Sequence, residues 1–360
     1  MPESFASAFA PASGRIYLDV ATYGLPPRDT MRAVRTALSA WQRGTGRWIE
    51  DWDSTAEACR ASFASLIGAR GSEIATQPAV SVAVALIAAA LRPGDEVVVP
   101  DNEFTSVLYP LLVAERRGVR VRQVPLGGLP DAIHAGTTLV ATSLVQMQTG
   151  LAAPLADILD AAARHGSRTL VDATQAVPMM PALRRHIGDI DYLVCAGYKH
   201  LLCPRGAAFL YVRESAWDSL EPIDAGWRAG DLPYGRYFGG PLQLAPDAAR
   251  YSVSQAWFSW VGARESLRLL NEWQAAGALA DVRLLAARLA QGLGVPDPGT
   301  TLICVPIGDD VGLARALKAS RIRVSVRGGS LRLSPHVHNH ASDIERAIEV
   351  IAPFVAGRAG

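Results

Sequence analysis

The chain has 360 residues, with 35 Lys and Arg against 34 Asp and Glu, so its formal net charge is +1. This balance leaves no electrostatic footprint for nucleic acid or for an anionic membrane surface. Hydrophobic residues make up 49% of the chain and charged residues 19%. This composition excludes a disordered chain, and the length is enough for two domains with cores of their own.

Membrane, secretory and disulfide-rich classes are excluded by further patterns. No window of about 18 residues is uninterruptedly apolar, so no membrane-spanning helix is expected. The apolar stretch from Ala79 to Leu91 fits a buried helix, and the first 15 residues lack the basic and apolar regions of a secretory signal. The four cysteines show no CxxC pair and no metal-ligand spacing. We therefore expect a cytoplasmic protein without structural disulfides and without a metal.

Strand and helix patterns alternate through the middle of the chain. Short apolar or alternating runs predict strands at Glu96–Pro100, Val119–Val124, Thr138–Ser143, Thr169–Asp172, Asp191–Cys195 and Ala207–Val212. Leu155–His165 has helical spacing and is followed by Gly166, a typical helix end. Apolar strands separated by helices predict an α/β protein with a mostly parallel sheet covered on both faces. In such sheets ligands bind beyond the carboxyl ends of the strands.

The second half of the chain differs from the first in composition and in its predicted elements. Gly, Pro and aromatic residues crowd the stretch from Trp217 to Tyr251, which predicts a long irregular segment with a functional role. Helices are predicted at Ser259–Ala276 and Ala278–Leu293. The remaining segments predict a small α+β domain, with strands at Leu302–Pro306, Arg323–Val326 and Leu331–Leu333 and helices near Val311–Ser320 and Ser342–Ala356.

Two polar residues at strand ends are the main candidates for chemistry. Lys199 follows a buried strand and fits either a surface loop or a Schiff-base amine activated by desolvation. Asp172 ends another strand and fits either a helix cap or a buried carboxylate that needs a cation, such as a protonated pyridine nitrogen. Gln175 could donate its amide to a phenolic oxygen. Together, Lys199 and Asp172 could hold opposite edges of one planar cofactor.

Other candidates are less specific. Phe104 follows a strand and fits either the core or a ring that stacks on a cofactor. Ser81 lies at the start of an apolar helix, whose free N–H groups could bind phosphate. Arg332 fits a partly exposed strand or a carboxylate site. His336, His338 and His340 alternate, but no carboxylate or cysteine pattern supports a metal there.

Taken together, these segments resemble the class V aminotransferase family of pyridoxal-phosphate enzymes. This is the fold-type I group that includes cysteine desulfurases, kynureninase and isopenicillin N epimerase. The resemblance extends over nearly the whole chain and is most specific at the aspartate and lysine motifs. It is carried by Tyr17–Gly24, Phe63–Ala69, Glu103–Pro110, Val171–Ala176, Ala196–His200 and Leu331–His336 with Asn339.

The resemblance implies a large cofactor-binding domain over residues 15–255, with a mostly parallel seven-stranded sheet. It also implies a small α+β domain over 256–360, joined by 1–14. Lys199 would carry pyridoxal 5'-phosphate as a Schiff base, and Asp172 would pair with the pyridine nitrogen. Gln175 would contact the phenolic oxygen, and Phe104 would stack on the ring.

The resemblance also implies the phosphate site, the substrate site and the oligomer. Tyr198, Ser81, the backbone around Val82, Trp227 and Ser254 would bind the cofactor, chiefly at its phosphate. Arg332, with Tyr23, would bind the substrate and its α-carboxylate. The protein would be a homodimer with both active sites at the interface, to which the aromatic stretches 227–238 and 251–257 would contribute.

The chain departs from the family pattern at several positions. Ala196 stands where a serine often precedes the lysine, and Ser81 stands where a threonine is usual. The histidine that stacks on the cofactor in desulfurases is replaced by Phe104. The loop Arg323–Ser330 contains no cysteine, which argues against a desulfurase that forms a persulfide.

The implied activity is that of an enzyme acting on an amino acid through an external aldimine and a Cα carbanion. We expect β-elimination first, such as a carbon–sulfur lyase, then amino-group transfer, then epimerisation. A non-catalytic binding module is disfavoured because Lys199, Asp172 and Gln175 are all present.

Overall fold

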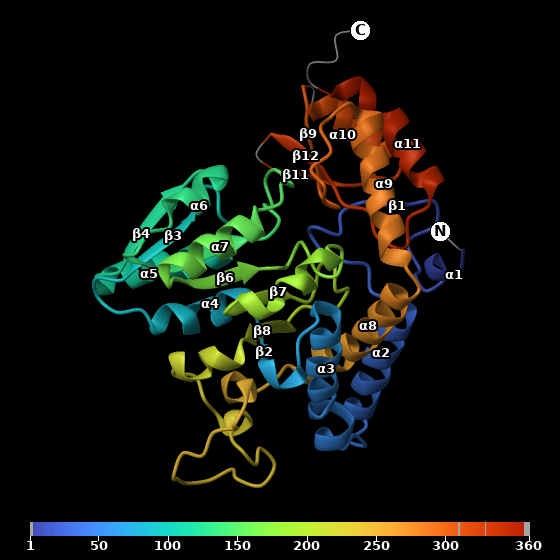
Figure 1. Cartoon of the computed structure of the whole chain (residues 1–360). Helices are drawn as coiled ribbons and strands as arrows, with labels where there is room; N and C mark the ends of the chain where they lie inside the picture. The colour runs from blue at the N-terminus through green and yellow to red at the C-terminus, as the bar shows by residue number, and fades with distance from the viewer. Residues whose placement is uncertain (1–2, 309, 328, 356–360) are drawn as a thin grey trace.

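The computed structural model describes residues 3–308, 310–327 and 329–355. A seven-stranded sheet covered by helices forms most of the protein, and a small sheet with its own helices lies at one end (Figure 1). The large sheet has the order β2-β8-β7-β6-β5-β3-β4. Its strands are β2 (Ile74–Gln77), β3 (Glu96–Pro100), β4 (Arg120–Val124), β5 (Thr137–Ser143), β6 (Arg168–Asp172), β7 (Tyr192–Ala196) and β8 (Ala208–Val212). β8 pairs antiparallel with both β2 and β7, and the other described pairs in this sheet are parallel, so the predicted mostly parallel sheet is confirmed.

Helices cover both faces of this sheet. α4 (Val80–Ala89) and α5 (Thr105–Ala114) pack on one face. α3 (Thr55–Ile67), α7 (Leu155–His165) and α8 (Trp257–Ala275) pack on the other. In β7, Leu193 belongs to the core under α3 and α8, whereas Val194 belongs to the core under α4 and α5. Because both faces of β7 are buried, its sequence is continuously apolar and does not alternate.

The C-terminal part forms a second core. Its sheet has the order β11-β12-β9, with β9 (Ile303–Pro306), β11 (Ser325–Arg327) and β12 (Ser330–Leu333). α9 (Ala278–Leu293), α10 (Asp310–Ala319) and α11 (Ala341–Ile351) accompany it. β1 (Ile16–Tyr17) pairs in parallel with β10 (Ile322–Arg323), so the start of the chain joins this part. The short helices α1 (Glu3–Ala6) and α6 (Leu129–Ala132) complete the fold.

The domain boundary at 255/256 stays a prediction. α8 lies just after it in the sequence, yet α8 packs on α2 (Arg28–Gln42) and α3. Thr30 of α2 shares a hydrogen bond of 2.8 Å with Ser266 of α8, and Asn271 donates one to the Ser62 carbonyl of α3.

Most predicted elements are present, and α7 and α9 have the predicted ends. Two predictions are wrong. Arg323–Val326 is not one strand, because Val324 separates β10, which pairs with β1, from β11, which pairs with β12. The last helix ends at Ile351, because Pro353 has no N–H and disfavours the helical conformation of the residue before it; a 3-10 turn, Ala352–Phe354, follows. Ala356, its predicted end, lies outside the described residues.

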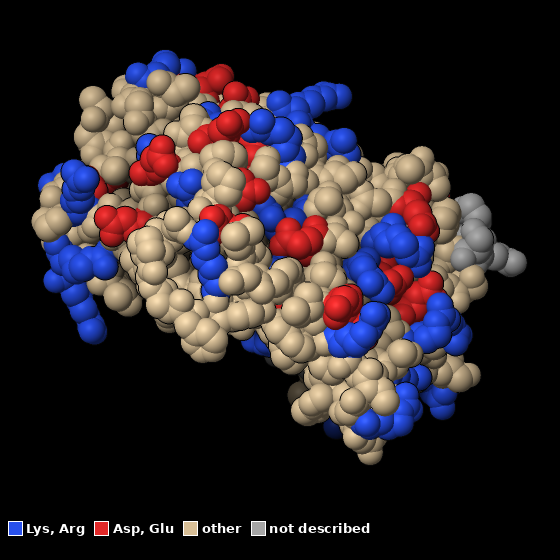
Figure 2. Space-filling model, turned by 90° about the horizontal axis from the view of Figure 1, so that it is seen from below, with Lys and Arg blue, Asp and Glu red and all other residues tan. Residues whose placement is uncertain are grey.

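The irregular segment is also confirmed. Between residues 221 and 251 the chain contains short 3-10 turns and one isolated bridge, and its loop projects from the body of the protein (Figure 1). On the face seen in Figure 2, acidic and basic side chains are interspersed, in line with the near-zero net charge. Within the described ranges, no helix has the length and apolar character needed to cross a membrane.

Candidate active site

The carboxyl ends of β6 and β7 lie side by side and carry the two main candidates. Asp172 is the last residue of β6 and pairs in register with Val194 of β7. Lys199 follows the end of β7, Phe104 immediately precedes α5, and Ser81 lies in the first turn of α4. All of these residues line one cavity of about 120 Å³. The structure therefore brings together residues that the sequence places around one planar ligand.

The amine of Lys199 is buried and free to react. The residue is 5% exposed, and within the described chain its Nζ has no hydrogen-bond or ion-pair partner. Nζ lies 5.3 Å from the centroid of the Phe104 ring and 5.9 Å from that of Tyr198. Burial lowers the pKa of Lys199 to about 8; nearby Asp172 opposes this shift and Arg332 adds to it. A buried amine with a lowered pKa suits a nucleophile or a base.

Asp172 is a buried carboxylate held in a fixed orientation. The backbone N–H of Thr174 donates to its Oδ1 at 2.8 Å. The Thr174 hydroxyl in turn accepts a hydrogen bond of 2.9 Å from the Ala196 N–H of β7. Burial raises the pKa of Asp172 to about 6, against the lowering effects of Thr174 and Lys199. A cationic ligand atom beside this carboxylate would favour its ionised form.

Gln175 lines a smaller adjoining cavity together with Phe104, Asp172 and Lys199. Its Nε2 donates to the Ala21 carbonyl at 3.1 Å, and its Oε1 lies 3.0 Å from Nε2 of His200. The amide therefore has one N–H left for a ligand. This is the arrangement expected of a donor to a phenolic oxygen.

The opposite end of the cavity suits an anion. Ala79, Val80 and Ser81 line it at the start of α4, where backbone N–H groups lack helical partners. Val82, the position named from the sequence, does not line the cavity, and its N–H bonds to the Ala79 carbonyl. Tyr198 does line the cavity, as predicted.

Arg332 is buried beside the cavity, and its guanidinium is held by neutral acceptors. Among the described residues no carboxylate pairs with it: it is 2% exposed, and its guanidinium donates to the Ser325 and Thr22 hydroxyls at 3.0 and 3.1 Å and to the Met147 carbonyl at 3.4 Å. Met147 also lines the small cavity beside Lys199. An arginine held by neutral acceptors next to the cavity can still bind a carboxylate in a bidentate pair. Tyr23 is 44% exposed and lines neither cavity.

Comparison with known proteins identifies the family. The sequence profile described as aminotransferase class-V matches residues 16–307. The chain belongs to the class-V aminotransferase family.

Curated relatives agree with this assignment, and a solved structure shares the fold. An uncharacterized aminotransferase of Bacillus subtilis (strain 168) is 27% identical, with 98% of both chains covered. An isopenicillin N epimerase of Amycolatopsis lactamdurans is 28% identical over 81% of this chain and 83% of its own. A probable cysteine desulfurase of Aeropyrum pernix is 30% identical over 64% of this chain and 60% of its own. The structure of a cystine C–S lyase with cysteine persulfide shares the fold, with a TM-score of 0.83 at 19% identity and 95% and 98% coverage.

This member of the class-V aminotransferase family is a pyridoxal-phosphate-dependent enzyme that acts on an amino acid. The residues present fit the cofactor. The unpartnered Lys199 amine suits its aldehyde, the buried Asp172 carboxylate suits its protonated ring nitrogen, and the start of α4 suits its phosphate.

Three further residues at this site were not predicted from the sequence. Glu103 is 5% exposed and accepts hydrogen bonds from the Phe104 and Ser143 N–H groups, both at 2.7 Å, so it fixes the backbone of Phe104 at the cavity. Thr174 orients Asp172. Arg205 lines the same cavity as Ser81 and Tyr198, with its guanidinium 5.0 Å from the Tyr198 ring. The signal for Arg205 was its place between Pro204 and Gly206, shortly after the lysine.

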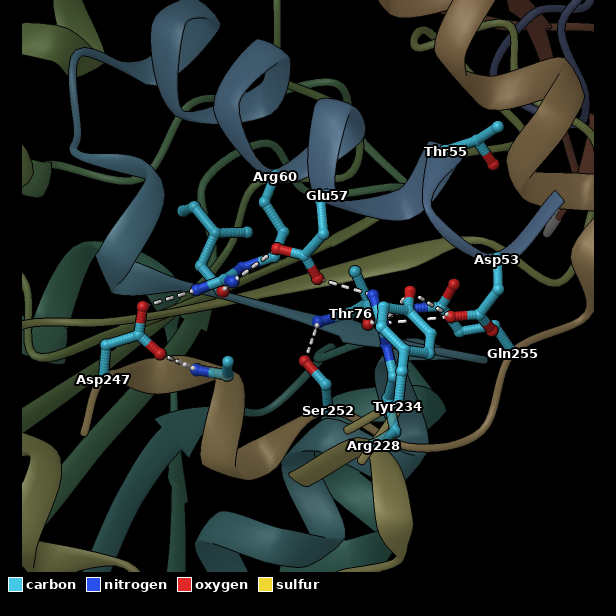
Figure 3. A network of polar contacts seen from close by, with 12 residues as sticks. Asp53, Thr55, Glu57, Arg60, Thr76, Arg228, Tyr234, Asp247, Ser252 and Gln255 are labelled. Carbon is cyan, nitrogen blue, oxygen red and sulfur yellow. Dashed lines mark hydrogen bonds and ion pairs between the residues drawn. The ribbon is translucent and has the colours of Figure 1, made fainter. Parts of the chain in front are cut away.

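Two predicted cofactor residues do not reach the cavity within one chain. Trp227 packs against Trp48, with ring centroids 5.9 Å apart, and Ser254 is exposed. The neighbouring Arg228 is buried and pairs with Asp53 at 2.9 Å and with Glu57 of α3 (Figure 3). This network fixes the base of the irregular segment and leaves its tip exposed.

Proposed function

We propose that this enzyme catalyses β-elimination on an amino acid with a sulfur substituent at Cβ, consuming one water and releasing a thiol, ammonia and a 2-oxo acid. The observation that carries the proposal is a site suited to pyridoxal phosphate that has no reactive thiol beside it. The loop Arg323–Ser330 has no cysteine, so sulfur has no cysteine acceptor there and would leave as a free thiol.

The four cysteines support this proposal. Burial raises the pKa of Cys59, Cys195 and Cys203, so none of these forms a thiolate near neutral pH. Cys304 faces Arg332 in the β9–β12 register, and burial raises its pKa to about 11. A persulfide forms by attack of a thiolate, and burial disfavours the thiolate form of all four cysteines.

The positions of the residues around the cavity support the proposed roles. Bound pyridoxal phosphate supplies an electron sink for Cα of the amino acid. Lys199 would hold the cofactor and would take the proton from Cα with an amine whose pKa is lowered by burial. Asp172 would pair with the protonated ring nitrogen of the cofactor, and Arg332 would bind the α-carboxylate of the amino acid.

Amino-group transfer is the second candidate, because the Bacillus subtilis relative that matches 98% of this chain is named an aminotransferase. The two reactions have different products. With S-alkyl cysteines and no 2-oxo acid added, β-elimination gives thiol, ammonia and pyruvate in equal amounts. Consumption of an amino donor only when a 2-oxo acid is present, without thiol release, would contradict the proposal. Cys304→Ser should keep the activity.

The attachment site has a direct test that does not depend on the reaction. The chain contains only two lysines, Lys199 and Lys318. Borohydride reduction of the holoenzyme followed by peptide mapping should place the cofactor mass on the peptide with Lys199. Mass on the peptide with Lys318 would refute the assignment, and Lys199→Ala should abolish labelling.

A homodimer completes the proposal. An apolar groove of about 590 Å³ runs between α4 and α5, with Tyr109, Val113 and Ile223 at least 60% exposed along it. The projecting loop carries Phe238, which is 96% exposed. The groove shares Ser81 with the cofactor cavity, so a second copy seated there would lie beside the phosphate and could contribute Trp227 and Ser254.

Light scattering should give the mass of two chains for the wild type. Phe238→Asp should shift the protein toward monomers, because it introduces a charge into an apolar interface. Leu284 of α9 is 67% exposed and lies outside this region, so Leu284→Asp is the matched control and should stay dimeric. A fully active monomeric wild type would overturn the dimer.

A further inference from the structure

His200 follows Lys199 directly, yet it points away from the cofactor cavity. It is fully buried, and its Nε2 lies 3.0 Å from Oε1 of Gln175. Its ring stacks on that of His336, with centroids 6.1 Å apart and planes at 23°. His336 Nε2 also donates to the His200 carbonyl at 3.1 Å, so both the backbone and the ring of His200 are held.

The hydrogen-bond partners determine where the protons lie. The Ala21 carbonyl can only accept, so the Gln175 atom that faces it must be the amide nitrogen. The Gln175 atom that faces His200 is therefore the amide oxygen, which also only accepts. His200 must then carry its proton on Nε2. Its buried Nδ1 has no hydrogen-bond partner among the described residues, as expected for the nitrogen without a proton.

We propose that His200 is a positioning residue that locks the Gln175 amide as a donor toward the cofactor. With Oε1 bonded to His200 and one N–H bonded to Ala21, only the second N–H can face the cavity. Gln175 can then stabilise an anionic phenolic oxygen and cannot accept from a protonated one. Without His200, the amide would be free to rotate and to present its oxygen to the ligand.

The inference rests on the proposed contact between Gln175 and the phenolic oxygen. The charge state of that oxygen determines the balance between the long- and short-wavelength absorption bands of bound pyridoxal phosphate. His200→Phe keeps a stacking ring and removes the donor. It should shift the band ratio toward the protonated form by about 2- to 10-fold, the range that corresponds to one net hydrogen bond. His200→Gln, which restores a donor, should return the ratio toward the wild-type value.

His338→Phe is the matched control. His338 is also buried, at 7% exposed, and stacks on His336, but its Nε2 bonds to the Tyr17 carbonyl and not to Gln175. This variant should leave the band ratio unchanged even if it lowers stability. In a Gln175→Ala background, His200→Phe should cause no further shift, because its effect passes through the amide.

Several results would overturn the inference. The inference fails if the band ratio is unchanged in His200→Phe or if His338→Phe shifts it equally. It also fails if His200→Phe causes its full shift in the Gln175→Ala background. Nitrogen NMR of the wild type provides a measurement that needs no variant, and a proton on Nδ1 of His200 would also refute the inference. Gln175→Ala distinguishes the two proposals. If it leaves the bands unchanged while Lys199 still carries the cofactor, then the proposed contact between Gln175 and the phenolic oxygen is itself wrong.

Discussion

Gly24 allows the N-terminal segment to approach the lysine loop closely. Its N–H donates to the Tyr198 carbonyl at 2.8 Å. A Cβ added at Gly24 would lie 2.3 Å from the Lys199 carbonyl oxygen and 2.7 Å from the Leu202 side chain, whereas ordinary contacts begin near 3.4 Å. Gly24→Ala must therefore push the lysine loop and the N-terminal segment apart.

The size of the effect follows from this geometry. The missing clearance is about 1 Å, and a misplacement of about 1 Å at a reacting group can lower a rate about 100-fold. Leu202 has little freedom to absorb the shift, because it already adopts a left-handed backbone conformation with φ of 57°. Overpacking of this kind also costs about 1–3 kcal/mol of the free energy of unfolding.

The assay can be independent of the reaction type. The rate at which an amino-acid substrate changes the absorption of bound pyridoxal phosphate should fall about 100-fold in Gly24→Ala. Gly188→Ala is the matched control, because a Cβ there meets nothing within 4 Å. If Gly24→Ala has the wild-type rate and unfolding midpoint, the lysine loop does not depend on this close approach.

Four further predictions concern single groups. Asp172→Ala should lower turnover at least about 100-fold while the fold survives by circular dichroism, because it removes an electrostatic stabiliser; an active variant would refute the role. Arg332→Lys should raise KM for the amino acid, since an ammonium cannot form a bidentate pair with a carboxylate. Loss of cofactor from Arg332→Ala would show that Arg332 does not belong to the carboxylate site. Arg205→Ala should weaken cofactor binding by about 10-fold or more in equilibrium dialysis, as expected for a lost bond to a charged group; an unchanged Kd would exclude that contact. Burial lowers the pKa values of His200, His336 and His338, so below about pH 6.5 the unfolded chain binds protons that the folded chain does not. The free energy of unfolding should therefore decrease as the pH is lowered, by up to about 1.4 kcal/mol per pH unit for each histidine. Equal denaturant midpoints at about pH 7 and about pH 5 would contradict this.

Local patterns in the sequence were enough to predict most elements and the centre of the site. α7 was predicted correctly at both ends because its helical spacing and the following Gly166, with φ of 70°, are properties of neighbouring residues. Lys199 and Asp172 were predicted because polar residues after buried apolar strands meet at one edge of a parallel sheet.

The tertiary structure alone decided which distant segments meet. The antiparallel β8 lies between β2 and β7, and Arg323–Val326 is divided between two pairing partners, because hydrogen bonds to remote strands determine both arrangements. The role of Glu103 depends on Ser143, and the orientation of the Gln175 amide depends on Ala21 and His200. Local periodicity carries no information on these contacts, since each arises from burying polar groups that must find partners far away in the chain.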